Sequence, residues 1–298
     1  MIRTVRFTGI AIFVTLAFAA VLHAQVTTND MRQGIAPKVI LYKTIGGVTL
    51  NLYVFLPSDL APGDKRTAVV WIHGGAWTGN SPALFFPHCR YYALRGAVAI
   101  SVQYRLVGST GNETVFDCIR DCRSAMRYIR GHARDLGIDP DRIAVMGDSA
   151  GGHLAACLGI INDFDEPGEG VSISPVPNAM ALYEPVLDLT VYPWVNLLGP
   201  AREASPLFFV GKNAPPAIVL HGFEDIVVPV ATSIEFNRLM AEQGNRCDLV
   251  VYGKTEHGFV VLDYIAPDSM VARAVRAGDD FLVGLGLLTG HPTLSASQ

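Results

Sequence analysis

The sequence predicts an α/β fold in which a mostly parallel central sheet carries helices on both faces. Strand-like and helix-like segments alternate along the chain, which is the pattern of parallel strands joined by crossover helices. Of the 298 residues, 50% are hydrophobic and 17% are charged, as in globular proteins. No internal repeat or low-complexity tract interrupts the pattern. Residues 25–298 are therefore expected to form one large domain with a well-buried core.

Seven strands are expected, several of them as short apolar runs. The run at 68–72 is apolar throughout and rich in β-branched residues, as a parallel strand buried on both faces is. Pro57 closes the strand before it, because proline cannot continue a sheet ladder. In chain order the expected strands cover 48–55, 68–72, 98–102, 143–146, 179–183, 217–220 and 248–252.

Helices are expected between and after these strands. Over 115–136 the apolar residues recur at three- or four-residue intervals, which is the period of a helix, and Asp139-Pro140 breaks that helix. The irregular segment 190–213 holds Trp194 and several prolines and is the candidate for a small cap. In chain order the expected helices cover 84–95, 115–136, 230–243 and 267–285, with a further helix start at 152–156.

The N-terminus has the pattern of a secretory signal peptide. Arg3 and Arg6 precede an apolar stretch over 7–22 without an acidic residue, and Ala24 offers a small residue for cleavage. Cleavage of residues 1–24 would place the chain in the periplasm or outside the cell, with no stable membrane insertion. An uncleaved anchor helix is the alternative, for which the stretch is short. The net charge of −4 and the lack of a basic run argue against a nucleic-acid partner.

The cysteines do not indicate a metal or cofactor site. They are Cys89, Cys118, Cys122, Cys157 and Cys247. Their odd number means that at least one is free or pairs between chains. Most are expected to be small buried hydrophobic residues, although a disulfide stays open in an exported chain. Because no cysteine or histidine spacing is that of a metal site, neither a metal nor an organic cofactor is expected.

A nucleophile motif stands between a strand and a helix. The sequence 147–151 reads Gly-Asp-Ser-Ala-Gly, directly after the apolar strand at 143–146 and before the helix start. A G-x-S-x-G at such a junction forms a tight turn that leaves the serine hydroxyl free at its tip. Glycines permit the close approach of strand and helix backbones. Ser149 is therefore the candidate nucleophile.

A base and an acid for this serine follow later in the chain. His257 comes after the last expected strand, and Asp225 comes after the strand at 217–220. Both loops lie at the carboxyl edge of the sheet, where reaction sites of open α/β sheets gather. The chain order of serine, acid and histidine is the one found with a nucleophile elbow. Glu224 is the competing acid, and the pattern His-Gly-x-x-Asp-x-x-Val-Pro favours Asp225.

Donors for an oxyanion are expected in the loop after the strand at 68–72. The loop reads His-Gly-Gly-Ala-Trp over 73–77, and glycine lets backbone N–H groups turn toward a substrate oxygen. The amides of Gly75 and Ala76 are the expected donors, together with the amide of Ala150 after the nucleophile. The side chain of His73 is expected to brace this loop.

These segments, with Ser-Val-Gln-Tyr-Arg-Leu at 101–106, resemble the α/β-hydrolases of the BD-FAE and hormone-sensitive-lipase-like esterase group. The resemblance covers roughly 39–285 and implies the α/β-hydrolase fold. It also implies a Ser/Asp/His triad that hydrolyses short acyl esters, often on carbohydrate. At Ala76 the chain departs from the lipase-like branch, which usually has a third glycine there. The sequence 73–77 is closer to BD-FAE proteins and kynurenine formamidases, so the substrate stays open.

The resulting hypothesis is an exported serine carboxylesterase that acts on a small-molecule or carbohydrate ester, such as acetyl or feruloyl xylan. Trp77 and Phe259 are the candidate substrate-binding residues, and core packing is the alternative for Trp77. One rival function is an amide hydrolase, either formamidase-like or peptidase-like. Another is a binding protein on a hydrolase scaffold, which the presence of Ser149, Asp225 and His257 disfavours. The natural ester and the oligomeric state do not follow from the sequence.

Overall fold

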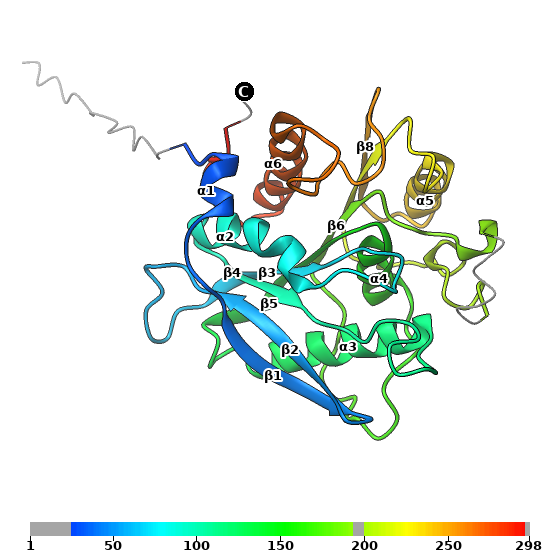
Figure 1. The fold of residues 1–298 in the computed structure, drawn as a ribbon, viewed down its shortest axis with the longest axis horizontal. Helices are drawn as coiled ribbons and strands as arrows, with labels where there is room; N and C mark the ends of the chain where they lie inside the picture. The colour runs from blue at the N-terminus through cyan, green and yellow to red at the C-terminus, as the bar shows by residue number, and fades with distance from the viewer. Residues whose placement is uncertain (1–24, 193–199, 296–298) are drawn as a thin grey trace, which may run out of the picture.

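An eight-stranded sheet runs through the computed structural model, which describes residues 25–192 and 200–295 (Figure 1). The strand order across the sheet is β1-β2-β4-β3-β5-β6-β7-β8. The strands are β1 (Lys38–Ile45), β2 (Val48–Phe55), β3 (Arg66–Ile72), β4 (Val98–Val102), β5 (Ile138–Asp148), β6 (Ala179–Tyr183), β7 (Ala217–Gly222) and β8 (Cys247–Tyr252). The six strands from β4 to β8 in this order are parallel, whereas β1 and β2 are antiparallel to their neighbours. The predicted α/β class with a mostly parallel sheet is confirmed.

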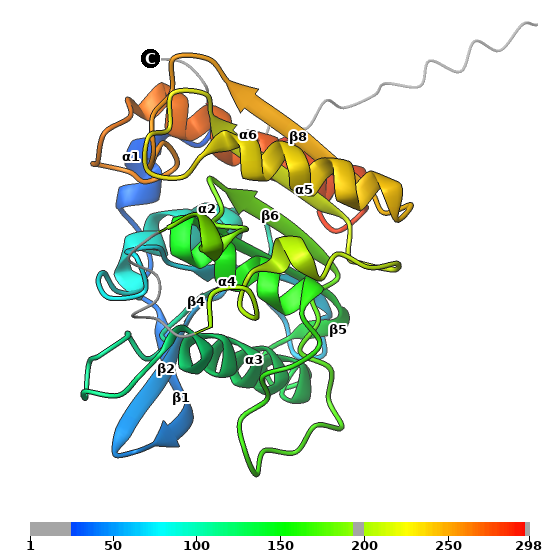
Figure 2. The ribbon, with the colours of Figure 1, turned by 90° about the vertical axis from the view of Figure 1, so that its right-hand side faces the viewer.

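Helices cover both faces of the sheet (Figures 1 and 2). One core cluster lies between the sheet and α3, α4 and α5, and the other lies between the sheet and α1, α2 and α6. Leu154 of α4 belongs to the first cluster and Tyr91 of α2 to the second. The helices are α1 (Thr28–Arg32), α2 (Phe86–Leu94), α3 (Val115–Gly131), α4 (Ser149–Ile160), α5 (Val230–Glu242) and α6 (Asp268–Gly284).

The helix expected over 115–136 ends earlier than its apolar pattern indicated. A capping box at Thr114 starts α3, because the Asp117 side chain accepts a hydrogen bond from the Thr114 amide at 2.8 Å. The helix ends at Gly131, and the Ile138 amide donates to the Ala133 carbonyl at 2.8 Å across a turn. Gly137 has a φ of +70°, which favours glycine, and it lies in the turn that leads from the helix to the next strand.

Part of the cap expected over 190–213 lies outside the described residues, as does the signal peptide expected over 1–24. The described part after 200 contains a short 3-10 helix at Pro206–Phe208 and packs on the body of the domain. Ala204 there is fully buried, and the Leu207 amide donates to the Leu187 carbonyl at 3.0 Å.

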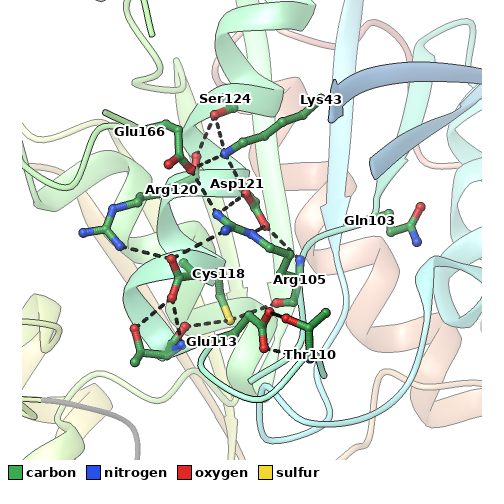
Figure 3. A network of polar contacts seen from close by, with 12 residues as sticks. Lys43, Gln103, Arg105, Thr110, Glu113, Cys118, Arg120, Asp121, Ser124 and Glu166 are labelled. Carbon is green, nitrogen blue, oxygen red and sulfur yellow. Dashed lines mark hydrogen bonds and ion pairs between the residues drawn. The ribbon is translucent and has the colours of Figure 1, made fainter. Parts of the chain in front are cut away.

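A buried ion network joins β1 and the loop after β4 to α3 (Figure 3). Asp121 of α3 has no exposed surface, and Arg105 binds it with its Nε 2.8 Å from Oδ2. Lys43 of β1 lies 2.7 Å from the same carboxylate and 2.6 Å from Glu166. Arg105 also lies 3.0 Å from Glu166, so two cations share two acids. The network anchors the outer strand to the helical layer.

The cysteines and the helices bear on the expected disulfide and the expected anchor helix. The five cysteines, all within the described residues, form no disulfide; four are buried and Cys247 is half-buried. None of the helices in the described residues is long and apolar enough to cross a membrane.

Candidate active site

The strand-to-helix turn at Ser149 has the geometry of a nucleophile elbow. β5 ends at Asp148 and α4 begins at Ser149, whose φ of +50° is unusual for a residue with a side chain. A Cβ atom on Gly147 would overlap the carbonyl of Gly151, and one on Gly151 would overlap the carbonyl of Ile72. Both glycines are therefore required for the turn, as the motif predicted.

The loops after β7 and β8 bring an acid and a base to this serine. His257 Nε2 lies 2.9 Å from Ser149 Oγ, and His257 Nδ1 lies 2.7 Å from Asp225 Oδ2. Ser149 and His257 are partly exposed, so a substrate can reach them. The competing acid Glu224 is exposed and makes no contact of this kind. The three side chains predicted from separate motifs thus form one hydrogen-bonded series.

The surroundings of Asp225 keep it ionised. Burial raises the pKa of Asp225, but hydrogen bonds from His221 and His257 outweigh that effect and hold the pKa well below its usual value. The amides of Val227 and Val228 each donate to Oδ1 at 2.8 Å. A fixed carboxylate of this kind orients the imidazole of His257 and stabilises its positive charge.

The loop after β3 presents backbone amides beside the elbow. Gly75 and Ala76 have φ values of +116° and +50°, and their amides donate to no other described residue. His73 braces the loop, since its ring stacks on Tyr104 and the Tyr104 hydroxyl donates to the His73 carbonyl at 2.8 Å. The exposed turn therefore has free N–H groups that suit an oxyanion.

The chain is similar to known proteins in sequence and in fold. Residues 52–188 match the BD-FAE family. Esterase 2 of Thermogutta terrifontis in its apo form superposes with a TM-score of 0.82 and is 39% identical, covering 86% of this chain and 97% of that one. The chain belongs to the α/β-hydrolase esterase family. The resemblance and the fold expected from it are thereby confirmed.

Curated members of this family are also similar in sequence. Esterase LipQ of Mycobacterium tuberculosis is 32% identical over 260 residues, which are 80% of this chain and 60% of LipQ. An acetylxylan esterase of Xylanibacter ruminicola is 28% identical over 229 residues, which are 70% of this chain and 43% of that protein. The chain thus spans about half the length of the curated relatives that it matches.

In this α/β-hydrolase, Asp148 of the elbow hydrogen-bonds a neighbouring loop, and the structure identifies the partner, which the sequence did not. Its Oδ1 accepts a hydrogen bond from the Gly74 amide at 2.6 Å, so the elbow is tied to the loop of free amides. Burial raises the pKa of Asp148 to about 6, although the Gly74 hydrogen bond and the charge of His257 act in the opposite direction. The signal that could have found it is an acidic residue inside an otherwise apolar turn.

Glu184 is an acid near the site that sequence analysis missed. It follows β6, has a φ of +34° and is fully buried, and among the described residues only the Gly258 amide acts on its carboxylate as a hydrogen-bond donor, without the geometry of a regular hydrogen bond. Burial, followed by the charges of Asp148 and Asp225, raises its pKa well above the ordinary value. The segment after Glu184 lies beside the proposed nucleophile, because the Val186 amide donates to the Ser149 carbonyl at 3.3 Å.

The two expected substrate-binding residues lie in the core. Trp77 is 1% exposed and Phe259 has no exposed surface. The Trp77 indole donates to His153 at 3.1 Å, and Phe259 packs edge-on against Tyr252. Phe259 borders a cavity of about 300 Å³, whose lining does not include Ser149. This placement favours core packing for Trp77, the alternative raised above, and gives a substrate-binding role for either residue no support.

Proposed function

We propose that the chain is a serine carboxylesterase whose triad is Ser149, His257 and Asp225. The observation that carries the proposal is the continuous series from Ser149 Oγ through His257 to Asp225, with contacts of 2.9 and 2.7 Å. Such spacing allows a proton to move from a serine hydroxyl to an imidazole that a carboxylate orients. Esterase relatives and esterase structural neighbours support the same chemistry.

The proposed reaction has two halves. Ser149 Oγ attacks the ester carbonyl carbon while His257 Nε2 takes its proton, and the carbonyl oxygen becomes an oxyanion held by the amides of Gly75, Ala76 and Ala150. The intermediate then expels the alcohol, which receives the proton from His257. In the second half water attacks the acyl-serine, again with His257 as base. Collapse releases the carboxylic acid and restores the Ser149 hydroxyl.

The proposed substrates are esters of short acids, including acetyl groups on carbohydrate. Structures of Thermogutta terrifontis esterase 2 with bound propionate and with bound butyrate support the short acyl group. An acetylxylan esterase among the relatives supports a carbohydrate ester. A panel of p-nitrophenyl acetate, butyrate and a long-chain ester, with acetylated and feruloylated xylan, separates these substrates. Faster turnover of the long-chain ester than of acetate contradicts the acyl preference.

The decisive experiment compares the wild-type chain with Ser149→Ala on p-nitrophenyl acetate. We expect the variant to lose at least about a thousandfold in kcat, because no other group replaces the nucleophile. A fluorophosphonate probe should label the wild-type chain and leave the variant unlabelled. Equal turnover by the two proteins, with both folded by circular dichroism, rejects the proposal.

Export is a separate proposal that rests on the sequence of residues 1–24. Expression of the full chain in a bacterial host, with N-terminal sequencing of the exported product, tests it. We expect the product to begin at Gln25, after the small residue Ala24. A product that keeps residues 1–24 contradicts cleavage.

A further inference from the structure

The loop of free amides is attached to the nucleophile elbow at both of its ends. On one side of Gly75 and Ala76, the Gly74 amide donates to Asp148 at 2.6 Å. On the other side, the indole Nε1 of Trp77 donates to His153 Nδ1 at 3.1 Å. Asp148 immediately precedes the nucleophile, so the first tie needs no further residue. The second tie depends wholly on the side chain of His153.

His153 belongs to the same helix as the nucleophile. It comes four residues after Ser149 on α4, which places the two on one face of that helix. The helix fixes the backbone of His153 relative to that of Ser149, and the Ala204 carbonyl, 2.6 Å from Nε2, holds the ring. Trp77 directly follows the expected oxyanion donors Gly75 and Ala76. Its hydrogen bond to His153 therefore holds this end of the loop at a fixed distance from Ser149.

The surroundings of His153 also fix the hydrogen positions on its ring. Its Nε2 lies 2.6 Å from the Ala204 carbonyl, which only accepts, so Nε2 carries the hydrogen. Its Nδ1 must then be the acceptor, and the Trp77 indole is purely a donor. The ring has no exposed surface, and burial lowers its pKa to about 4 although the Ala204 hydrogen bond opposes this. The neutral ring is thus the form that both partners need.

The backbone of the tied loop explains why the tie is needed. Gly75, Ala76 and Trp77 all have φ in the left-handed region, at +116°, +50° and +59°. Two of the three carry side chains, for which this conformation is unfavourable and persists only when the surroundings impose it. Burial of the Trp77 indole and its hydrogen bond supply that constraint at the far end of the turn.

We propose that His153 is a positioning residue for the oxyanion loop, which it holds to the nucleophile helix through the indole of Trp77. The role rests on the proposed function above. Its consequence is a specific kinetic signature. Because misplaced amides weaken binding of the oxyanion more than binding of the ester, loss of the tie lowers kcat and leaves KM nearly unchanged.

The test uses His153→Leu, Trp77→Phe and the double variant, each assayed on p-nitrophenyl acetate. We expect each single variant to lose about tenfold to a hundredfold in kcat with KM within about twofold, since the loss of a whole donor costs about a hundredfold or more. The double variant should be no slower than the slower single variant, because both changes remove the same contact. Losses that multiply in the double variant overturn the proposal.

A matched control removes a buried hydrogen bond elsewhere. Tyr91 of α2 lies in the other core cluster, and its hydroxyl donates to the buried carboxylate of Asp279. Tyr91→Phe should lower the thermal midpoint and leave kcat unchanged. If Tyr91→Phe lowers kcat as much as His153→Leu at a similar midpoint, the effect is one of general stability and the positioning role is rejected.

A readout besides activity separates this proposal from the proposed function. Nitrogen NMR of labelled histidine and tryptophan should show His153 as the Nε2–H tautomer, with a Trp77 indole resonance that shifts in His153→Leu. If the NMR spectra show the Trp77–His153 hydrogen bond but His153→Leu has an unchanged kcat, the positioning role is rejected and the proposed function stands. Absence of Ser149-dependent turnover in the wild-type chain overturns the proposed function, and the positioning role with it.

Discussion

The Asp148 carboxylate accepts a hydrogen bond from the Gly74 amide at 2.6 Å and so joins the nucleophile elbow to the oxyanion loop. The two residues are far apart in sequence, at the ends of the adjacent parallel strands β3 and β5. A Cβ atom on Gly74 would lie 2.7 Å from Asp148 Oδ2, so the contact also requires glycine. The acid beside the proposed nucleophile therefore positions the loop.

This contact predicts different effects for two substitutions of Asp148. Asp148→Ala removes the acceptor and should lower kcat on p-nitrophenyl acetate by about tenfold to a hundredfold, because the donors of the loop lose one anchor. Asp148→Asn keeps an oxygen for the Gly74 amide and should lose much less. Steady-state kinetics of both variants measure the difference. An asparagine variant slower than the alanine variant contradicts the hydrogen-bonding role.

Glu184 predicts that stability falls as pH rises. Its pKa is raised well above 4.5 in the folded chain, chiefly by burial, so the folded state holds its proton more tightly than the unfolded state does. The stabilisation is complete below pH 4.5 and is lost as pH rises toward the folded pKa. Glu184→Gln cannot ionise, so the thermal midpoint of the wild-type chain should fall relative to that of the variant as the pH rises above 4.5. A constant difference between the two midpoints rejects this.

A buried histidine away from the triad, His88, predicts a loss of stability in acid. Burial lowers its pKa from 6.5 to about 4, although its hydrogen bond to the Val260 carbonyl opposes this. The unfolded chain therefore binds the proton first as pH falls, and stability drops between pH 6.5 and 4. Relative to His88→Gln, the wild-type free energy of unfolding should fall by up to about 3 kcal/mol over that window. Urea unfolding at pH 7, 6 and 5 measures both free energies of unfolding. If the difference between the two proteins is the same at all three pH values, the prediction is wrong.

The network in Figure 3 predicts a large loss of stability when Asp121 is removed. Asp121→Ala would remove the buried acid of the network and leave Arg105 and Lys43 only the half-buried Glu166 to share, at a cost of about 3 kcal/mol. The control is Arg238→Ala, which breaks pairs between exposed side chains on α5 and should lower stability far less than Asp121→Ala does. Urea unfolding measures both. Equal losses in the two variants contradict the assignment of Asp121 as a buried anchor.

The sequence anticipated most of the sheet but not its antiparallel edge. The strands expected over 48–55, 98–102 and 179–183 match β2, β4 and β6 residue for residue. β4 and β6 are buried along their whole length and β2 mainly at alternate residues, so apolar side chains mark all three strands. β1 was missed, since its side chains are largely exposed and its pairing with β2 is decided by strand contacts, not by hydrophobicity.

The candidate site was predictable where a motif fixes the backbone. Ser149, Asp225 and His257 were identified from turns and strand ends, and the structure brings all three within hydrogen-bonding distance. Trp77 and Phe259 were assigned to the substrate because they are apolar and adjoin these motifs. Proximity in sequence does not give the direction of a side chain, and both point into the core.

The sequence by itself determined the class of fold and indicated the candidate site residues and their order along the chain. Each of these depends on local patterns: apolar runs, glycines at tight turns and residues at strand ends. Only the tertiary structure decided which neighbours hold the site in place. The contacts of Gly74 with Asp148 and of Trp77 with His153 join residues 74 and 76 positions apart. Both contacts form because β3 pairs with β5, which brings the loop after β3 beside the start of α4, and no local sequence pattern encodes that pairing.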